Sequence, residues 1–332
     1  MKISVVIPVR NEATSIRSLL DRLLEQTLKP EEIVITDGGS TDTTVKIIEE
    51  YVSKGIPLRL VRTRMALPGR GRNLSAAQAC SDWLAFTDAG VVPSTVWLES
   101  LARAVAKDEG VDVVYGSYEP IVDTLFKECA AIAYVPPLVE IDGSLMRPHS
   151  ITSALMRKSV WEKAGGFPEH LRSAEDLLFM NKVAATASRI SYAPGAVVRW
   201  SLRPTWWTTF KKFVVYSRNN ILAGLWRDWQ AAIFKRYGLL LLLSVPAFFV
   251  GWWWLGVVIP AWLAMLTTRA MVAIWRNRRS YPMTPTRNFV RLSLVVPLIA
   301  LIDLAAIVGT LNWLIKDKLH LKSEPVRIRD GA

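Results

Sequence analysis

The segment 37–42, with the sequence DGGSTD, combines two carboxylates with two consecutive glycines. It follows the apolar run 33–36 and precedes a segment with helical spacing of apolar residues, which predicts a turn between a strand and a helix. Gly38 and Gly39 allow a ligand to approach the backbone, and the Asp37 carboxylate can accept hydrogen bonds from a base or a ribose. The same residues also suit a capped turn that binds nothing, so the segment alone leaves both interpretations open.

A second acidic residue, Asp88, follows the apolar run 83–87. A carboxylate at the end of a strand can face a divalent cation that bridges a diphosphate. A single aspartate in such a place does not define a site, so its meaning depends on what lies beside it in the fold.

Two further segments carry charges that could do chemistry. Arg70 and Arg72 flank Gly71, and their guanidinium groups could clamp a diphosphate. This segment lacks the third glycine of a dinucleotide fingerprint and does not follow the first strand, which argues against an oxidoreductase. Glu175 and Asp176 precede the apolar run 177–180 and are expected to open a helix. Both acids could instead serve only the helix dipole.

The elements that would position these residues alternate regularly. Apolar runs at 3–7, 33–36, 58–61 and 83–87 predict strands, and the segments between them have helical spacing. This alternation favours a mostly parallel, doubly wound α/β sheet. Ligands bind beyond the carboxyl ends of the strands in such sheets, and Asp37 and Asp88 both fall there.

Taken in order, these pieces form a pattern that resembles the family 2 glycosyltransferases of the GT-A fold. The pattern comprises PVRNE at 8–12, DGGSTD at 37–42, GRGRN at 69–73 and then Asp88. GGF at 165–167 and the pair Glu175 and Asp176 match the acceptor side of that family, and Trp200 and Arg203 match its closing segment loosely. The resemblance covers about residues 1–220. It implies a Rossmann-like, mostly parallel sheet with flanking helices, followed here by an α-helical membrane domain.

The resemblance also implies roles for individual residues. Glu12 and Asp37 would contact the nucleoside, Arg72 would lie near the diphosphate, and Asp88 would lie at the ribose or a metal. Asp176, paired with Glu175, would be the general base that an inverting transfer needs to take the proton of the acceptor hydroxyl. The expected donor-binding residues are Pro8, Arg10, Glu12, Asp37, Gly39, Arg72, Asn73 and Asp88.

One departure from the family concerns the metal. The family usually has Asp-x-Asp where this sequence has Asp88, Ala89 and Gly90, so the second carboxylate is missing. Mg²⁺ or Mn²⁺ could still bind through phosphates, water and Asp88, because Mg²⁺ needs few protein ligands. Asp88 is therefore the one metal-binding residue expected. His149 could add a ligand on the acceptor side or be structural.

The charge is divided unevenly along the chain. The formal net charge of +12 falls entirely after residue 204, because residues 1–204 carry equal numbers of acidic and basic residues. Eleven of the 14 tryptophans also lie from Trp200 onward. A basic, Trp-rich and apolar half fits a membrane surface better than a nucleic acid. Cys80 and Cys129 show no metal-binding spacing and fit a reducing cytosol.

The apolar half predicts the membrane organisation. Residues 205–220 combine Trp206, Trp207 and Phe210 with lysines, which is typical of an interfacial amphipathic helix. The apolar stretches 237–275 and 292–315 are long enough for two spans and one span, respectively. The expected parts are a cytosolic domain at 1–204, interfacial helices at 205–236, transmembrane helices at 237–315 and a basic tail at 316–332.

Two points about the membrane part stay open from the sequence. Asp303 lies inside the third apolar segment, where it could be functional or form a contact between helices. Three spans cannot place all the basic segments on the cytosolic side, whereas one longer span in 237–275 would leave the arginines at 276, 278 and 279 outside. Three spans are expected.

The sequence therefore predicts a multi-pass cell-membrane enzyme with a cytosolic catalytic domain. Its substrates would be a nucleoside-diphosphate sugar and a lipid or lipid-linked acceptor. One alternative is a polyprenyl-phosphate sugar synthase, which has the same chemistry with a phosphate acceptor. The other is a non-catalytic, nucleotide-binding membrane protein, although no paired broken-helix repeat typical of transporters is evident. The sugar, the nucleotide base and the oligomeric state are not encoded in recognisable motifs.

Overall fold

The computed structural model of the protein describes residues 1–187 and 189–319, and these form two compact units. The sheet unit comprises Met1–Leu202 together with Ala273–Asn288. The helical unit comprises Arg203–Val272 and the chain from Phe289 onward. Residues 273–288 thus fold with the sheet unit, although the sequence analysis assigned them to the membrane part. The expected basic tail lies outside the described residues from position 320 onward.

The sheet unit contains an eight-stranded sheet with the strand order β3-β2-β1-β4-β9-β6-β10-β5. Strands β1 to β4 pair in parallel, as do β6 and β10, whereas β9 runs antiparallel to both of its neighbours and β5 antiparallel to β10. A separate hairpin is formed by β7 and β8. The strands are β1 (Ile3–Val9), β2 (Glu32–Asp37), β3 (Leu58–Arg62), β4 (Trp83–Phe86), β5 (Val91–Pro93), β6 (Val113–Ile121), β7 (Val139–Ile141), β8 (Ser144–Met146), β9 (Ala154–Arg157) and β10 (Ile190–Ser201).

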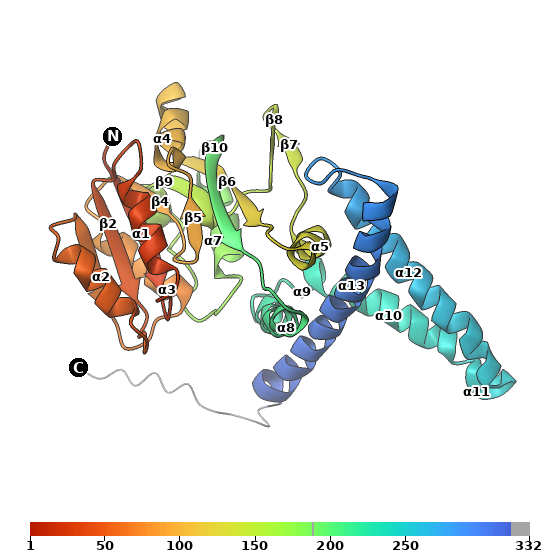
Figure 1. Ribbon diagram of the computed structural model, residues 1–332. Helices are drawn as coiled ribbons and strands as arrows, with labels where there is room; N and C mark the ends of the chain where they lie inside the picture. The colour runs from red at the N-terminus through yellow and green to blue at the C-terminus, as the bar shows by residue number, and fades with distance from the viewer. Residues whose placement is uncertain (188, 320–332) are drawn as a thin grey trace. The chain divides into compact units, whose positions relative to one another are not determined.

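Helices cover both faces of this sheet (Figure 1). They are α1 (Ile16–Leu24), α2 (Thr44–Val52), α3 (Pro68–Gln78), α4 (Trp97–Lys107), α5 (Leu125–Tyr134), α6 (Lys158–Lys163) and α7 (Glu175–Thr186). The expected mostly parallel α/β sheet with flanking helices is therefore confirmed. Helix α3 begins at Pro68, and a proline suits the first turn of a helix.

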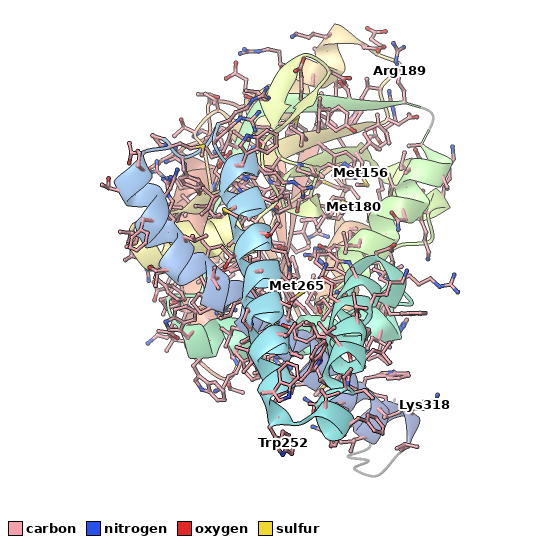
Figure 2. All side chains as sticks on the ribbon, turned by 90° about the vertical axis from the view of Figure 1, so that its right-hand side faces the viewer. Met156, Met180, Arg189, Trp252, Met265 and Lys318 are labelled. Carbon is pink, nitrogen blue, oxygen red and sulfur yellow. The ribbon has the colours of Figure 1, made fainter. Side chains whose placement is uncertain are left out.

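The two faces of the sheet follow from the alternation of side chains along each strand. In β1, Val5 and Ile7 face the core that α1, α2 and α4 cover, whereas Val6 faces the core that α3, α6 and α7 cover. Met156 of β9 and Met180 of α7 belong to this second core and lie close together in Figure 2. The apolar runs of the sequence are continuous because both faces are buried.

Within the described residues, the helical unit holds three helices long and apolar enough to cross a membrane, at Ala231–Val250, Trp252–Arg276 and Pro285–Lys318. Figure 2 shows Trp252 at the tip of a hairpin between the first two of them, with Met265 farther along α12. Its elements are α8 (Trp206–Leu222), α9 (Trp226–Trp229), α10 (Ala231–Ser244), α11 (Ala247–Val250), α12 (Leu255–Arg276, which ends in the sheet unit) and α13 (Pro285–Trp313, which begins there). The tip exposes Phe248, Phe249, Trp252 and Trp253.

Polar contacts join the helices of this unit. Asp303 of α13 is fully buried, pairs with Arg269 of α12 and accepts a hydrogen bond from the Tyr237 hydroxyl of α10 at 3.1 Å. Asp303 therefore makes the contact between helices that the sequence analysis left open. The Ser217 hydroxyl of α8 donates to the Ala306 carbonyl at 2.8 Å. A side chain at Gly309 would collide with the Val214 carbonyl, so α8 and α13 need a glycine there.

Candidate functional site

Arg72 is the centre of the charged residues at the carboxyl ends of the strands. Its guanidinium group donates to Asp88 at 2.7 Å through Nη2 and to Glu175 at 2.8 Å through Nη1. The side chain is 5% exposed and lies over the Phe167 ring, 5.3 Å from its centroid. The two carboxylates stabilise its positive charge and raise the pKa of Arg72 despite burial. Arg72 thus joins α3, the end of β4 and the start of α7.

These two ion pairs limit how Arg72 could bind a diphosphate. Both of its terminal nitrogens already bind carboxylates, and its Nε atom is buried without a partner among the described residues. Arg72 positions Asp88 and Glu175 and does not present an open fork to a ligand. Its contact with a diphosphate stays a prediction. Arg70 is more accessible, with its nearest carboxylate, Glu169, 4.0 Å away.

The two acids at the start of α7 have different surroundings. Glu175 is buried and bound to Arg72, whereas Asp176 is partly exposed and its Oδ1 accepts the Leu177 N–H at 2.9 Å. Burial raises the pKa of both carboxyl groups, and Arg72 opposes the shift in each. The charge of Asp88 raises the pKa of Asp176 further. Asp176 is therefore the more accessible member of the pair.

The backbone conformation just before α7 orients these two acids. Ala174 has a φ of +70°, a left-handed conformation that is uncommon for a residue with a side chain. Such conformations persist where the surrounding structure enforces them, and they cluster at functional sites. The turn at Ala174 brings Glu175 into contact with Arg72.

The DGGSTD turn closes tightly over Asp37. The Asp37 carboxylate accepts the N–H groups of Gly39 and Ser40, each at 3.2 Å. A side chain at Gly38 would lie 2.6 Å from the Ala66 carbonyl, and one at Gly39 would lie 2.2 Å from the Arg64 carbonyl. Asn11 ties the 8–12 segment to this turn, because its side chain accepts the Thr41 N–H at 2.8 Å. The glycines here serve the packing of backbone on backbone.

A hollow of about 480 Å³ lies beside this turn. It is lined by Asp37, Ser40, Val45, Arg62, Thr63 and Arg64. The last four of these are not among the residues expected from the sequence. The sequence gives little sign of the three residues 62–64 as part of a site. Only the parallel register of β2 and β3, which places Arg62 beside Asp37, brings them to the same edge of the sheet.

The residues around Asp88 show what a metal could use. Among the described residues, no group of three or more His, Cys, Asp or Glu side chains is arranged to hold a metal. Asp88 gives one oxygen to Arg72 and is 31% exposed. The Glu12 carboxylate lies 3.9 Å from the place that a side chain at Gly90 would take. This donor set fits a cation held mainly by the phosphates of a ligand, with Asp88 as its protein contact.

The other predicted donor-binding residues have varied surroundings. The Asn73 amide donates to the Phe167 carbonyl and accepts the Phe167 N–H, each at 2.9 Å, and it also accepts the Trp161 ring N–H. Its contact with the donor stays a prediction. Pro8 packs against Gly71, where a side chain would lie 2.9 Å from it. Arg10 is exposed at the end of β1. The His149 ring packs against the Tyr115 ring at a tilt, with ring centroids 4.6 Å apart, which favours its structural role.

Comparisons with known proteins agree with this geometry. Residues 4–162 match the family model described as glycosyl transferase family 2. The poly(ribitol-phosphate) beta-N-acetylglucosaminyltransferase TarS of Staphylococcus aureus is 30% identical over 199 residues, which cover 58% of this chain and 34% of TarS. The O-antigen chain rhamnosyltransferase RfbN of Salmonella typhimurium is 26% identical over 221 residues, 60% of this chain and 67% of RfbN. This chain thus spans about a third of TarS.

Solved structures show the same fold. The Pyrobaculum calidifontis mannosyltransferase PcManGT, in complex with GDP-Man and Mn²⁺, superposes with a TM-score of 0.54 at 20% identity, covering 95% of this chain and 88% of that one. TarS 1-349 in complex with UDP-GlcNAc superposes with a TM-score of 0.51 at 20% identity, covering 93% and 92%. The family match ends before Glu175 and Asp176. The chain therefore contains a segment that matches glycosyl transferase family 2, in a GT-A fold that is followed, in the described residues, by three helices long and apolar enough to cross a membrane.

Proposed function

We propose that this protein transfers a sugar, with inversion, from a nucleoside-diphosphate sugar to a lipid or lipid-linked acceptor at a membrane. The observation that carries the proposal is the cluster of Arg72, Asp88, Glu175 and Asp176 at the carboxyl ends of the strands in a family 2 domain. Donor and acceptor chemistry both need carboxylates at this edge of the sheet.

Asp176 is the general base in this proposal. Its carboxylate takes the proton of the acceptor hydroxyl as that oxygen bonds to the anomeric carbon and the bond to the nucleoside diphosphate breaks. A carboxyl group whose pKa is raised is a stronger base near neutral pH than an ordinary one. Glu175, held by Arg72, keeps α7 in place and supports the position of Asp176.

The nucleoside is expected beside Asp37, and the diphosphate between that turn and Asp88. The relatives support this class of donor, since the compared structures hold UDP-GlcNAc and GDP-Man. A Mg²⁺ or Mn²⁺ ion held by Asp88 and the diphosphate would neutralise charge on the leaving group. The chain's own residues orient the donor through the backbone of the DGGSTD turn and Asp37.

The membrane topology in this proposal has the sheet unit and the 273–288 segment on the cytosolic side. The segment folds into the sheet unit, where Arg287 pairs with the buried Glu128 and the Asn277 side chain donates to the Ile132 carbonyl. It carries Arg276, Arg278 and Arg279, and cytosolic loops are enriched in such residues. The first two apolar helices would then cross as a hairpin.

Helix α8 would lie at the level of the lipid headgroups. Trp207 is 60% exposed, stacks on Phe210 and lies beneath the Lys211 ammonium group. Replacing Trp206 and Trp207 by serine should lower transfer to a lipid acceptor much more than donor hydrolysis, while the protein stays membrane-bound. Equal loss of both rates, with a lower melting temperature, would show that these tryptophans pack structurally.

The decisive experiment uses detergent-purified protein, a panel of labelled nucleotide sugars and a total lipid extract, with products analysed by mass spectrometry. Transfer should give a lipid whose mass increases by one sugar residue, and Asp88→Ala should abolish the product. A product only with polyprenyl phosphates would favour the sugar synthase alternative. No transfer and no donor hydrolysis with any nucleotide sugar would leave the protein as a nucleotide-binding scaffold and reject the proposal.

A further inference from the structure

A second charged cluster lies within the helical unit, far along the chain from the residues described above. Arg269 makes a two-bond ion pair with the buried Asp303, in which Nη2 donates to Oδ1 at 3.0 Å and Nη1 to Oδ2. The Tyr237 hydroxyl donates to the same carboxylate. One arginine, one aspartate and one tyrosine therefore satisfy each other.

Arg236 adds a second positive charge beside this ion pair. It precedes Tyr237 on α10, attracted electrostatically by Asp303 and repelled by Arg269. Its Nε atom is buried, and no residue in the described part of the chain accepts a hydrogen bond from it. The cluster thus has two guanidinium groups for one carboxylate, and the second guanidinium is partly buried, with no acceptor for its Nε atom among the described residues. Burying a donor without a partner costs free energy, which an added acceptor would recover.

The position of Arg236 along the helices indicates which acceptor that is. Arg236 follows the start of the first apolar helix by five residues, and Arg269 precedes the end of the second by seven. At 1.5 Å per residue these are roughly 8 and 10 Å inside the hairpin ends. No charged residue occurs in 237–268. In a bilayer, the two arginines would lie near one headgroup layer, where phosphates are the abundant anions.

We propose that Arg236, beside the ion pair of Arg269 and Asp303, binds the phosphate group of a lipid. A guanidinium fork matches two phosphate oxygens, and charge-assisted bonds of this kind are stronger than neutral ones. Because Asp303 neutralises one arginine, the cluster has one positive charge to offer, which suits one phosphate group. The lipid is either an anionic phospholipid or a polyprenyl phosphate. This site is separate from the transfer reaction and does not depend on it.

The test measures lipid binding to the full-length protein in detergent by native mass spectrometry. The probes are phosphatidylglycerol, a polyprenyl monophosphate and inorganic phosphate. Arg236→Gln is compared with Lys235→Gln, which removes an equal charge from the exposed neighbouring residue. Arg236→Gln should weaken lipid binding about tenfold or more, since a hydrogen bond to a charged group is worth about 1.5–3 kcal/mol. Lys235→Gln should change it less than threefold.

The probes distinguish the two lipids. An Arg236-dependent affinity for phosphatidylglycerol assigns a bilayer lipid, and one for the polyprenyl phosphate alone assigns a carrier lipid. Equal binding by the two variants, or inorganic phosphate binding as tightly as the lipids, would overturn the proposal. If Arg236→Gln unfolds at a lower temperature than the wild type, Arg236→Lys is used as well, because it keeps the charge and loses the guanidinium fork. The lipid affinity of Arg236→Lys should be lower than that of the wild type and of Lys235→Gln, and higher than that of Arg236→Gln. Wild-type affinity in Arg236→Lys would reject recognition by the fork. The binding assay contains no donor, so its result is independent of transferase activity.

Discussion

The sheet unit and the helical unit each hold a cluster of arginine and aspartate or glutamate, and the two clusters differ in which charge is in excess. Around Arg72, three carboxylates accompany one guanidinium, and two of the three bind it directly. Around Asp303, two guanidinium groups accompany one carboxylate, and one of the two binds it. In both places the ion pair fixes the geometry, and the unpaired group carries the excess charge.

This difference teaches which partner each cluster needs. The excess carboxylate, Asp176, can take a proton, and the charge around it also favours a cation. The excess guanidinium, Arg236, favours an anion. A buried pair contributes little net stability by itself, because desolvation offsets its attraction. The group left over is therefore the one whose removal should affect chemistry more than folding.

The largest expected effect comes from replacing Asp176, the carboxylate in excess in the sheet unit. Asp176→Asn should lower the rate of transfer about 10²- to 10⁴-fold, because the acceptor proton loses its base. Donor binding, measured by isothermal titration with the nucleoside diphosphate, should stay within a few-fold. Glu109→Gln, which alters an exposed carboxylate, is the control and should keep full activity. Near-normal turnover in Asp176→Asn would mean that another group is the base.

Replacing Arg72, which is paired with two carboxylates, should instead affect folding. Arg72→Gln leaves Asp88 and Glu175 without their guanidinium partner, which should lower the free energy of unfolding by about 3–5 kcal/mol. Arg70→Gln is a matched control two residues away, where a surface pair is worth less than about 1 kcal/mol. Denaturant titration of both variants measures the difference. Similar losses in the two variants would contradict the central position of Arg72.

The corresponding change in the helical unit should be milder. Asp303→Asn removes the negative charge and one of the two oxygens that accept from Arg269 and Tyr237, but polar contacts between membrane helices are worth at most about 2 kcal/mol. The melting temperature in detergent should fall, and Asp228→Asn, at an exposed position, should not change it. An unchanged melting temperature in Asp303→Asn would show that the pair does not hold the three helices together.

The smallest effect is a dependence of stability on pH. The pKa of Asp176 is raised in the folded protein, so its protonated form favours folding below the ordinary carboxyl pKa, and this contribution is lost as the pH rises through the raised value. At neutral pH the ionised carboxylate therefore costs stability. Asp176→Asn should gain more melting temperature over the wild type at neutral pH than at acidic pH. A gain that is equal at both pH values would contradict the raised pKa.

The sequence could predict the sheet, because continuous apolar runs separated by helical spacing specify a buried parallel sheet whatever the details of packing. It could also predict that Asp37 and Asp88 share one edge. It could not predict that Arg72 binds two carboxylates, because residues 72, 88 and 175 meet only in the folded chain. The partners of Asp303 were hidden for the same reason, since helical periodicity does not say which helices touch.

The place of residues 273–288 in the sheet unit has a consequence for biosynthesis. A ribosome must make the whole apolar hairpin before it reaches the last segment of the sheet unit, which includes Arg287, the partner of Glu128. At about 5–20 residues per second, that segment emerges seconds after the sheet itself. Insertion of the hairpin should therefore precede completion of the sheet unit. A chain cut after residue 204 would release a domain that lacks one of its own pieces.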